Sequence, residues 1–283
     1  MTPQLAIRDL RHVYTDGSVG LDGCTLKISR GSRNALLGIN GSGKTTLLQH
    51  INGLLRPCTG ELLLDGQPLD YSRAGLSALR RRVGLVFQNP DRQLISANVI
   101  EDVSFGPLNL GLDTTSVRQR VAAALAAVGM SGHAERPVHR LSFGEKKRVC
   151  IAGVLAMQPE LLLLDEPMAG LDAGMQAELL AVLDTLAAQG ITILLTTHDV
   201  DFAYRWADNL HLLASGRCVG SFPAVELPAH SAELQAAGQA QPAVTALHQA
   251  LAGRGIIASQ TVARSIDQLL HALSAGNKSE RNA

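Results

Sequence analysis

The stretch GINGSGKTT (38–46) decides the fold of this 283-residue chain. It follows the apolar run NALLG (34–38) and precedes LLQHING, so we expect a strand, a glycine-rich loop and a helix in that order. The pattern G-x-x-x-x-G-K-[ST] is typical of a loop whose backbone N–H groups surround the phosphates of a nucleotide. A helix that starts near Lys44 adds its positive N-terminal end. The sequence therefore predicts a P-loop, and a glycine-rich turn that binds nothing is the alternative.

Polar residues in and after this loop have separate expected roles. Lys44 is expected to reach the β- and γ-phosphates, and the Thr45 hydroxyl to ligate Mg²⁺. The strand LLLLDE (161–166) ends in two carboxylates. Beside a P-loop, Asp165 is expected to help hold Mg²⁺, and Glu166 to orient the attacking water. A charged turn that closes an apolar strand would explain the carboxylates alone, but the P-loop disfavours it.

The spacing of apolar residues predicts two kinds of sheet. Residues 1 to about 35 alternate apolar and polar, and ELLLDGQPL (61–69) adds to the same small antiparallel sheet. Strands apolar on both faces are typical of a parallel sheet covered by helices. Such runs are NALLG (34–38), VGLVF (83–87), LLLLD (161–165) and ITILLTT (191–197). The predicted fold class is therefore α/β, with ligands bound at the polar ends of these strands.

Helices are expected at about 90–155 and again near the C-terminus. One helix is predicted from a cap at Ser116 to Gly129. Its buried face would be Val117, Val121, Ala124 and Val128. Two amphipathic helices should follow a linker marked by Pro223 and Pro228, and end at caps formed by Gly253 and Gly276. Their apolar positions are Val244, Leu247 and Leu251, then Val262, Ile266, Leu269, Leu270 and Leu273. Residues 277–283 are expected to be disordered.

Composition narrows the class of protein. Lys and Arg together number 25, as do Asp and Glu, so no net field favours nucleic acid. The four cysteines are far apart, which fits free thiols in a reducing cytosol. The N-terminus lacks the apolar region of a secretory signal, and no apolar run approaches the ~18 residues that span a bilayer. A role at a membrane would be that of a peripheral subunit.

These motifs, taken with LSFGE (141–145), resemble the nucleotide-binding subunits of ATP-binding cassette (ABC) transporters over residues 1 to about 222. The resemblance implies a P-loop NTPase fold with a parallel core sheet, an antiparallel β subdomain and a helical subdomain at about 90–155. A small C-terminal helical dimerisation domain would occupy 223–276. ATP and Mg²⁺ are the implied cofactors.

The resemblance also implies the residues of the ATP site. Tyr14 would stack on adenine, Gln88 would form the Q-loop, Asp172 the D-loop, and His198 would be the switch histidine. The ATP-binding residues would be Tyr14, Gly38, Asn40, Gly41, Ser42, Gly43, Lys44, Thr45 and Thr46. Mg²⁺ would be held by Thr45, Gln88 and Asp165, and the catalytic residues would be Glu166, His198 and Gln88. A transition-metal site in HDVD (198–201) is the alternative use of that histidine.

The signature LSFGE would act on a second subunit's nucleotide. In the family two subunits pack head to tail, so Ser142, Gly144 and the following helix would cap the γ-phosphate held by the partner. A Ser-x-Gly turn before a helix offers an anion a hydroxyl and free N–H groups. The commonest signature is LSGGQ, from which Phe143 and Glu145 depart. The negative charge of Glu145 would be offset by KKR (146–148), unless that run is a solvated helix face.

The segments VFQNPDRQLISANVIEDVSFGPLNLGL and HDVDFAYRWADN resemble the energy-coupling-factor importers, and within them the cobalt and nickel branch. This implies an ATP-hydrolysing subunit, peripheral on the cytoplasmic face of the inner membrane. The implied partners are a second copy, a transmembrane coupling subunit docking near Gln88 and a membrane substrate-binding subunit for the ion, with no nucleic acid. A vitamin importer, a soluble ABC ATPase without a transporter and a P-loop kinase of small metabolites are the alternatives.

Overall fold

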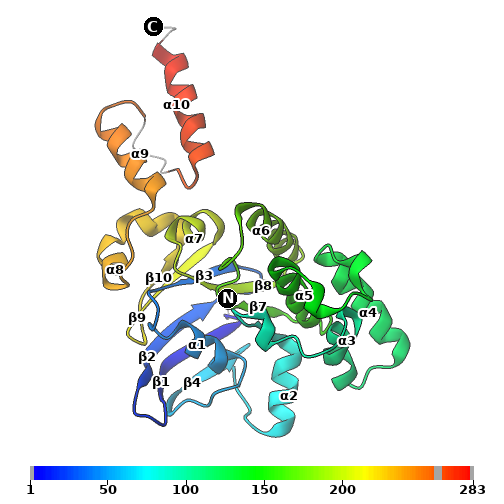
Figure 1. Ribbon diagram of the computed structural model, residues 1–283. Coiled ribbons are helices and arrows are strands. Elements are labelled where there is room, and N and C mark those ends of the chain that lie inside the picture. The colour runs from blue at the N-terminus through cyan, green and yellow to red at the C-terminus, as the bar shows by residue number, and fades with distance from the viewer. Residues whose placement is uncertain (1–2, 258–262, 281–283) are drawn as a thin grey trace.

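The computed structural model describes residues 3–257 and 263–280 (Figure 1). Its larger sheet has six strands in the order β10-β9-β3-β8-β7-β6. Strands β3, β6, β7, β8 and β9 run parallel to their neighbours, and β10 pairs antiparallel with β9. These strands are β3 (Arg33–Leu37), β6 (Val83–Val86), β7 (Leu161–Leu164), β8 (Thr192–Thr197), β9 (Asn209–Ala214) and β10 (Arg217–Pro223). The four apolar runs thus form the predicted parallel sheet, whereas β9 and β10 were not predicted.

The smaller sheet is antiparallel, with the order β2-β1-β4-β5. Its strands are β1 (Leu5–Val13), β2 (Val19–Ile28), β4 (Thr59–Leu64) and β5 (Gln67–Pro68). Alternate residues of the core strand β7 face two separate hydrophobic clusters. Leu162 and Leu164 belong to the cluster beneath the later helices, and Leu161 and Leu163 to the cluster shared with the small sheet. Burial on both faces explains why this strand is apolar at every position.

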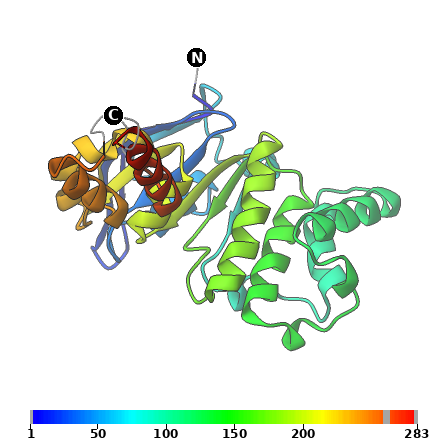
Figure 2. The same cartoon turned by 90° about the horizontal axis from the view of Figure 1, so that it is seen from above.

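Helices cover the parallel sheet, and further helices lie beyond it at both ends of the molecule (Figures 1 and 2). They are α1 (Lys44–Ile51), α2 (Arg73–Arg82), α3 (Val99–Asn109), α4 (Thr114–Ala127), α5 (Phe143–Leu155), α6 (Ala173–Ala188), α7 (Val200–Trp206), α8 (Ser231–Ala236), α9 (Ala243–Gly253) and α10 (Ile266–Glu280). Short 3₁₀ turns are η1 (Pro90–Arg92), η2 (Ser131–His133), η3 (Val138–Arg140) and η4 (Ala224–Ala229). Figures 1 and 2 show α3 and α4 at one end of the molecule, and α9 and α10 at the other. Among the described residues, no helix has the length and apolar character needed to cross a membrane.

The start of α4 differs from the prediction. The cap is Asp113, whose carboxylate accepts hydrogen bonds from the backbone N–H groups of Thr115 (2.9 Å) and Ser116 (3.0 Å). Ser116 lies inside the helix and donates its hydroxyl to the same carboxylate, at 2.6 Å. The acidic side chain three residues before Ser116 therefore replaces Ser116 as the cap. The stop at Gly129, which has φ +68°, and the burial of the four predicted apolar residues are confirmed.

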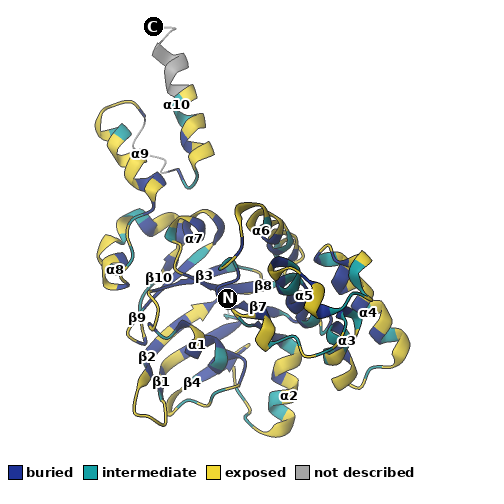
Figure 3. Cartoon of the chain, in the orientation of Figure 1, coloured by how far each residue is buried: buried dark blue, intermediate teal, exposed yellow. Residues whose placement is uncertain are grey.

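The C-terminal helices also end elsewhere than predicted. Gly253 is the last residue of α9, and the left-handed residue that follows the helix is Gly255, with φ +71°. Helix α10 continues through Gly276 to Glu280, so the predicted cap at Gly276 is wrong. Val262 and residues 281–283 lie outside the described residues. Figure 3 shows that most of the described surface of α9 and α10 is exposed.

The C-terminal segment is joined to α7 by hydrogen bonds at both ends of that helix. Near its start, the Asp201 carboxylate accepts the backbone N–H of Ala243 at 2.7 Å. At its end, the Arg264 guanidinium donates to the carbonyls of Tyr204 (2.9 Å from Nε) and Ala207. Arg264 thereby satisfies carbonyls that a helix C-terminus leaves unpaired.

Candidate functional site

The P-loop lies between β3 and α1, and it has no room for a side chain at Gly38 or Gly43. A Cβ at Gly38 would lie 2.4 Å from the Leu213 carbonyl oxygen and 2.5 Å from the Ser42 hydroxyl. Gly41 and Gly43 have φ values of +80° and +105°, which glycine adopts without steric cost. Gly43 is the N-cap of α1 and supplies no side-chain cap, so the first N–H groups of the helix remain available to an anion.

Lys44 is directed back across this loop. Its side chain is buried, and Nζ donates to the carbonyls of Gly38 (2.7 Å) and Ile39 (3.2 Å). The same nitrogen lies 3.7 Å from Oε1 of Glu166. The ammonium therefore lies between the glycine loop and a carboxylate from another strand.

Asp165 is held by two threonine hydroxyls. The Thr45 hydroxyl donates to Oδ2 and the Thr196 hydroxyl to Oδ1, both at 2.7 Å. The Thr196 oxygen also accepts the backbone N–H of Glu166 at 2.8 Å. Sequence reasoning missed Thr196, although the TT pair at the end of the run 191–197 marked the position. Hydroxyl and carboxylate oxygens of this kind suit Mg²⁺.

Glu166 connects the P-loop with His198. Oε2 lies 3.1 Å from Nδ1 of His198, and Oε1 is buried without a hydrogen-bond partner among the described residues. The backbone of Glu166 has φ +45°, which is uncommon for a residue with a side chain. Strain at such a position points to a constraint on where the carboxylate lies.

The carboxylates that follow His198 have other partners. Asp199 caps α7 by accepting the backbone N–H of Phe202 at 2.9 Å, and Asp201 accepts that of Ala243. The pairing of His198 with Glu166 therefore accounts for the histidine better than a site built from HDVD.

Tyr14 lies beside the first turn of α1. Its hydroxyl is 2.7 Å from that of Thr46, and a Cβ at Gly20 would lie 2.8 Å from its ring. The side chain is partly exposed, and Asn40 is exposed in the P-loop itself. Tyr14 is therefore adjacent to the P-loop, and its stacking on adenine stays a prediction.

Gln88 is exposed just after β6, and no hydrogen bond of its side chain is found within the described residues. The loop around it is organised by Gln93 instead. Gln93 Oε1 accepts the backbone N–H of Phe87 at 3.0 Å, and Nε2 donates to the Cys150 carbonyl at 3.4 Å. The segment FQNPDRQL contains Gln93, but the sequence alone predicted no role for it. The contact of Gln88 with Mg²⁺ stays a prediction.

Ser142 and Glu145 form a capping box at the start of α5. The Ser142 hydroxyl accepts the N–H of Glu145 at 3.2 Å, and Glu145 Oε2 accepts the N–H of Ser142 at 2.7 Å. Arg136 donates to Oε1 of the same carboxylate at 2.8 Å. The hydrogen bond from Ser142 and the Arg136 charge lower the pKa of Glu145.

The charge of Glu145 is therefore balanced by Arg136 and not, as predicted, by residues 146–148. Lys146 pairs with Asp91 at 2.7 Å, and Arg148 pairs with Glu178 at 2.9 Å. The solvated-face alternative is also wrong for Lys147, which is 3% exposed. Burial lowers the pKa of Lys147 to about 8.

The signature turn faces a pocket that the P-loop does not enter. The pocket has a volume of about 240 Å³, and its lining residues are Ser142, Gly144, Glu145, Arg148, Leu171, Met175, Glu178 and Leu179. None of residues 38–46 lines it. A Cβ on Gly144 would lie 3.0 Å from Met175 Sδ, so the turn is closely packed against α6. Asp172 caps α6 by accepting the Met175 N–H at 2.9 Å.

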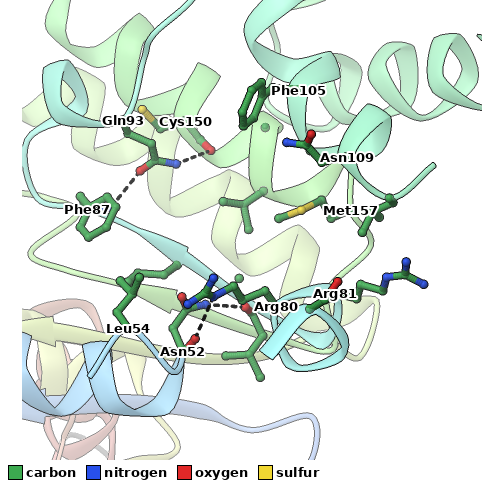
Figure 4. A pocket seen from close by; sticks show the side chains of 18 of the residues that line it. Asn52, Leu54, Arg80, Arg81, Phe87, Gln93, Phe105, Asn109, Cys150 and Met157 are labelled. Atoms are coloured by element: carbon green, nitrogen blue, oxygen red, sulfur yellow. Dashed lines mark hydrogen bonds between the residues drawn. The ribbon is translucent and has the colours of Figure 1, made fainter. Parts of the chain in front are cut away.

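A larger groove of about 660 Å³ lies between α2 and β6 on one side and α3 and α5 on the other. Figure 4 shows Phe105, Asn109 and Met157 facing Leu54, Arg80 and Arg81 across it, with Phe87 and Gln93 at one end. Gln88 is not among the lining residues.

Known proteins carry the same pattern. The ABC transporter family model matches residues 21–169. The energy-coupling factor transporter ATP-binding protein EcfA of Methanothermobacter thermautotrophicus is 43% identical, over 95% of this chain and 87% of that protein. The cobalt import ATP-binding protein CbiO of Rhodobacter capsulatus is 48% identical, over 86% of this chain and 87% of that protein.

Solved structures agree with this pattern. The structure of CbiO1 from Clostridium perfringens, part of the ABC transporter complex CbiONQ, has a TM-score of 0.75 at 43% identity, and the match covers 83% of this chain and 94% of that one. A dimeric ATP-binding cassette in a post-hydrolysis state, bound to ADP and Pi, has a TM-score of 0.70 at 27% identity, covering 78% and 98%.

Three features together define an ABC ATPase. The P-loop follows strand β3 of a largely parallel sheet, Asp165 and Glu166 follow β7, two strands away, and the signature turn lies apart from both. The chain belongs to the ABC transporter family. It is the ATP-hydrolysing subunit of a transporter of the type found in its energy-coupling-factor and cobalt-import relatives, and its family binds ATP with Mg²⁺.

Proposed function

We propose that this subunit powers an energy-coupling-factor importer for cobalt or nickel ions, as one half of a head-to-tail dimer of identical chains. The subunit would be peripheral, on the cytoplasmic face of the inner membrane. Its membrane partners would be a coupling subunit and a subunit that binds the ion. The name of the cobalt-import relative supports cobalt as the cargo, and the EcfA relative supports the class of importer. The C-terminal pair of helices supports the dimer, because its exposed apolar residues Leu247, Ile266 and Leu270 are available to a second copy.

The observation that carries the proposal is the cluster of Lys44, Thr45, Asp165, Glu166 and His198 at the polar ends of β3, β7 and β8. Lys44 would leave the carbonyls of its own loop and bind the β- and γ-phosphates. Thr45 and Asp165 would hold Mg²⁺, which when bound neutralises phosphate charge. Oε1 of Glu166 is buried and has no hydrogen-bond partner in the described chain, so it is the oxygen best placed to accept a proton from the attacking water once Lys44, now 3.7 Å away, has moved to the phosphates.

His198 would position this carboxylate. Its Nδ1 already lies 3.1 Å from Oε2, so the remaining ring nitrogen is left to contact the γ-phosphate. Tyr14, Asn40, Gly41, Ser42, Gly43 and Thr46 would complete the nucleotide site of the chain itself. Ser42 has a buried hydroxyl without a partner in the described chain, which a phosphate oxygen would satisfy.

The separate pocket at Ser142 and Gly144 supports completion of the site by a second subunit. Because the P-loop does not line that pocket, the signature would act on the nucleotide of the partner. The Asp172 turn, packed beside the signature, would lie at the same interface.

The groove of Figure 4 is the proposed docking site of the coupling subunit. It has the volume of a typical ligand cleft, and its lining is mostly apolar, with Phe87, Phe105 and Met157 among the lining residues. Docking there would displace the loop that Gln93 ties to α5, and thereby move Gln88 relative to the nucleotide. This would link transport to hydrolysis.

Hydrolysis by Glu166 is tested with Glu166→Gln. The variant should bind ATP, accumulate as a dimer in gel filtration and lose turnover. Lys44→Ala, which should lose ATP binding, is the control. If Glu166→Gln turns over ATP at a rate close to that of the unchanged protein, Glu166 does not activate the attacking water.

Cross-chain completion is tested by mixing variants. Ser142→Arg should block hydrolysis while its own P-loop stays intact, and Lys44→Ala has an intact signature. A mixed dimer would contain one complete site, so mixing should restore activity that neither variant has alone. No recovery at any ratio would count against the head-to-tail arrangement.

The cargo is tested by uptake of radiolabelled cobalt and nickel in cells that express this subunit with its membrane partners. Uptake that depends on Glu166 is expected for one of these ions. If uptake of a vitamin depends on Glu166 and neither ion is taken up, the cargo is a vitamin, and the proposed ATPase mechanism is unaffected.

A further inference from the structure

Lys147 is a buried cation that has no carboxylate partner within the described chain. It lies on α5, five residues after Ser142, and its Nζ donates to three backbone carbonyls. These belong to Glu166 (3.3 Å), Pro167 (2.6 Å) and Ala169 (2.7 Å). An ammonium group has three N–H donors, so each has one acceptor.

The three carbonyls belong to the turn that carries Glu166. That turn connects β7 with the D-loop, and a hydrogen bond from the Ala169 N–H to the Glu166 carbonyl (3.1 Å) closes it. The positive φ of Glu166 means that the direction of its side chain depends on how the turn is held. Lys147 is the charged side chain that holds it.

Phe143 joins the same unit from the signature. The Lys147 ammonium lies 5.2 Å from the centre of the Phe143 ring. A Cβ on Gly170, which has φ +75°, would lie 3.0 Å from Cε1 of that ring. Phe143 thus packs between Lys147 and Gly170, so its ring lies on the turn that follows Glu166.

We propose that Lys147 is a positioning residue that fixes Glu166 through the carbonyls of residues 166, 167 and 169, and so makes hydrolysis in one ATP site depend on the signature that faces the other. This rests on the proposed function of Ser142 and Glu166. Ser142 is the N-cap of α5, and Lys147 lies in the second turn of the same helix. A movement of α5 when Ser142 meets the partner's nucleotide would therefore reach the Glu166 backbone through Lys147 without a flexible segment between them.

Removing the ammonium should affect chemistry more than binding. Lys147→Met keeps the length and apolar stem of the side chain but leaves three carbonyls without their donor. Lys44 and the glycine loop do not contact Lys147, so ATP affinity should be retained. Displacement of a general base by about 1 Å costs up to ~10²-fold in rate.

The test compares Lys147→Met with Lys147→Arg and with the matched control Lys146→Met, because Lys146 pairs with the exposed Asp91 at the surface. For Lys147→Met, kcat should fall at least about tenfold, while the Kd for ATP should change by less than about twofold. Lys147→Arg should recover part of the rate because it restores a cation and its donors. Lys146→Met should have the same kcat as the unchanged protein.

Two further measurements make the outcome decisive. In the Glu166→Gln background, Lys147→Met should still form the ATP-dependent dimer, because only the position of the side chain at 166 is altered. If Lys147→Met folds poorly, ethylammonium added to Lys147→Ala should raise its turnover, and tetramethylammonium, which has no N–H donor, should not.

The proposal is overturned if kcat of Lys147→Met stays within about twofold of the unchanged protein. It is also overturned if kcat, ATP affinity and thermal stability fall together, which would make Lys147 only structural. Failure of the proposed function looks different, because then the unchanged protein itself would show no turnover that Glu166→Gln abolishes.

Discussion

Replacing Glu145 by Ala separates two views of this signature. If the carboxylate faced phosphate, its removal would raise ATP affinity in the dimer. In the structure it is instead turned back onto its own helix start, where it accepts the Ser142 N–H and the Arg136 guanidinium. We therefore expect Glu145→Ala to weaken the start of α5 and to leave ATP affinity unchanged.

The magnitude follows from the two contacts that are lost. Loss of a helix cap costs about 1 kcal/mol. The Arg136 side chain is 40% exposed and that of Glu145 is 17% exposed, so their ion pair contributes about 0.5–1 kcal/mol after solvent screening. Glu145→Ala should therefore lower the free energy of unfolding by about 1.5–2 kcal/mol. Glu145→Gln keeps an acceptor for Ser142 and should lower it by about half as much.

Urea unfolding followed by circular dichroism measures the effect on stability, and an ATP titration of the Glu166→Gln dimer measures the effect on affinity. Ser142→Ala combined with Glu145→Ala should cost less than the sum of the single changes, because each residue satisfies the other's backbone. The reasoning is refuted if Glu145→Gln tightens ATP binding several-fold while stability is unaltered.

Three further changes test other parts of the structure. Gly170→Ala places a Cβ at φ +75° and 3.0 Å from Phe143, so the free energy of unfolding should fall by about 1–2 kcal/mol in urea, and Phe143→Ala in the same chain should recover part of the loss. Arg82 and Arg30 lower the pKa of Glu160 from 4.5 to about 2, so the stability contributed by this carboxylate is present above pH 4.5 and is lost as the pH falls toward 2. A pH series of thermal melts should therefore show Glu160→Gln converging with the unchanged protein at acid pH; a gap that stays constant would contradict the assignment. Thr45→Val removes the hydroxyl that donates to Asp165. The rate of ATP turnover should fall at least about tenfold, and a titration of turnover with Mg²⁺ should show that more Mg²⁺ is needed. An unchanged Mg²⁺ dependence would exclude Thr45 as a ligand.

Local patterns were enough to predict the core of the fold. The predictions of the four parallel strands and of the antiparallel strands are confirmed, because the spacing of apolar residues shows whether a strand is buried on one face or on two. Strands β9 and β10 were missed. His211 is buried in β9, where Ser221 and Asn34 satisfy its ring nitrogens by hydrogen bonds. This polar residue interrupts the apolar run, so the sequence pattern did not predict a buried strand there.

Side chains whose partners lie far along the chain were predicted less well. Lys147 was grouped with its neighbours in KKR, yet its acceptors lie 19–22 residues later. Thr196 contacts Asp165 from another strand, and Gln93 joins a loop to α5 across 57 residues. Helix ends failed for a different reason. Gly253 and Gly255 are both possible stops, and only the packed structure selects between them.

The hydrogen bonds at the two ends of α7 bear on how the chain is best engineered. That helix begins two residues after His198, and its first and last turns are fastened by Ala243 and Arg264 from the C-terminal segment. A tag, fusion or deletion that disturbs Arg264 would leave the Tyr204 carbonyl unpaired and loosen the backbone that carries the histidine. A chain trimmed to the nucleotide-binding part alone would then show the kinetics of an altered enzyme, so assays of this subunit should keep the segment that contains Ala243 and Arg264.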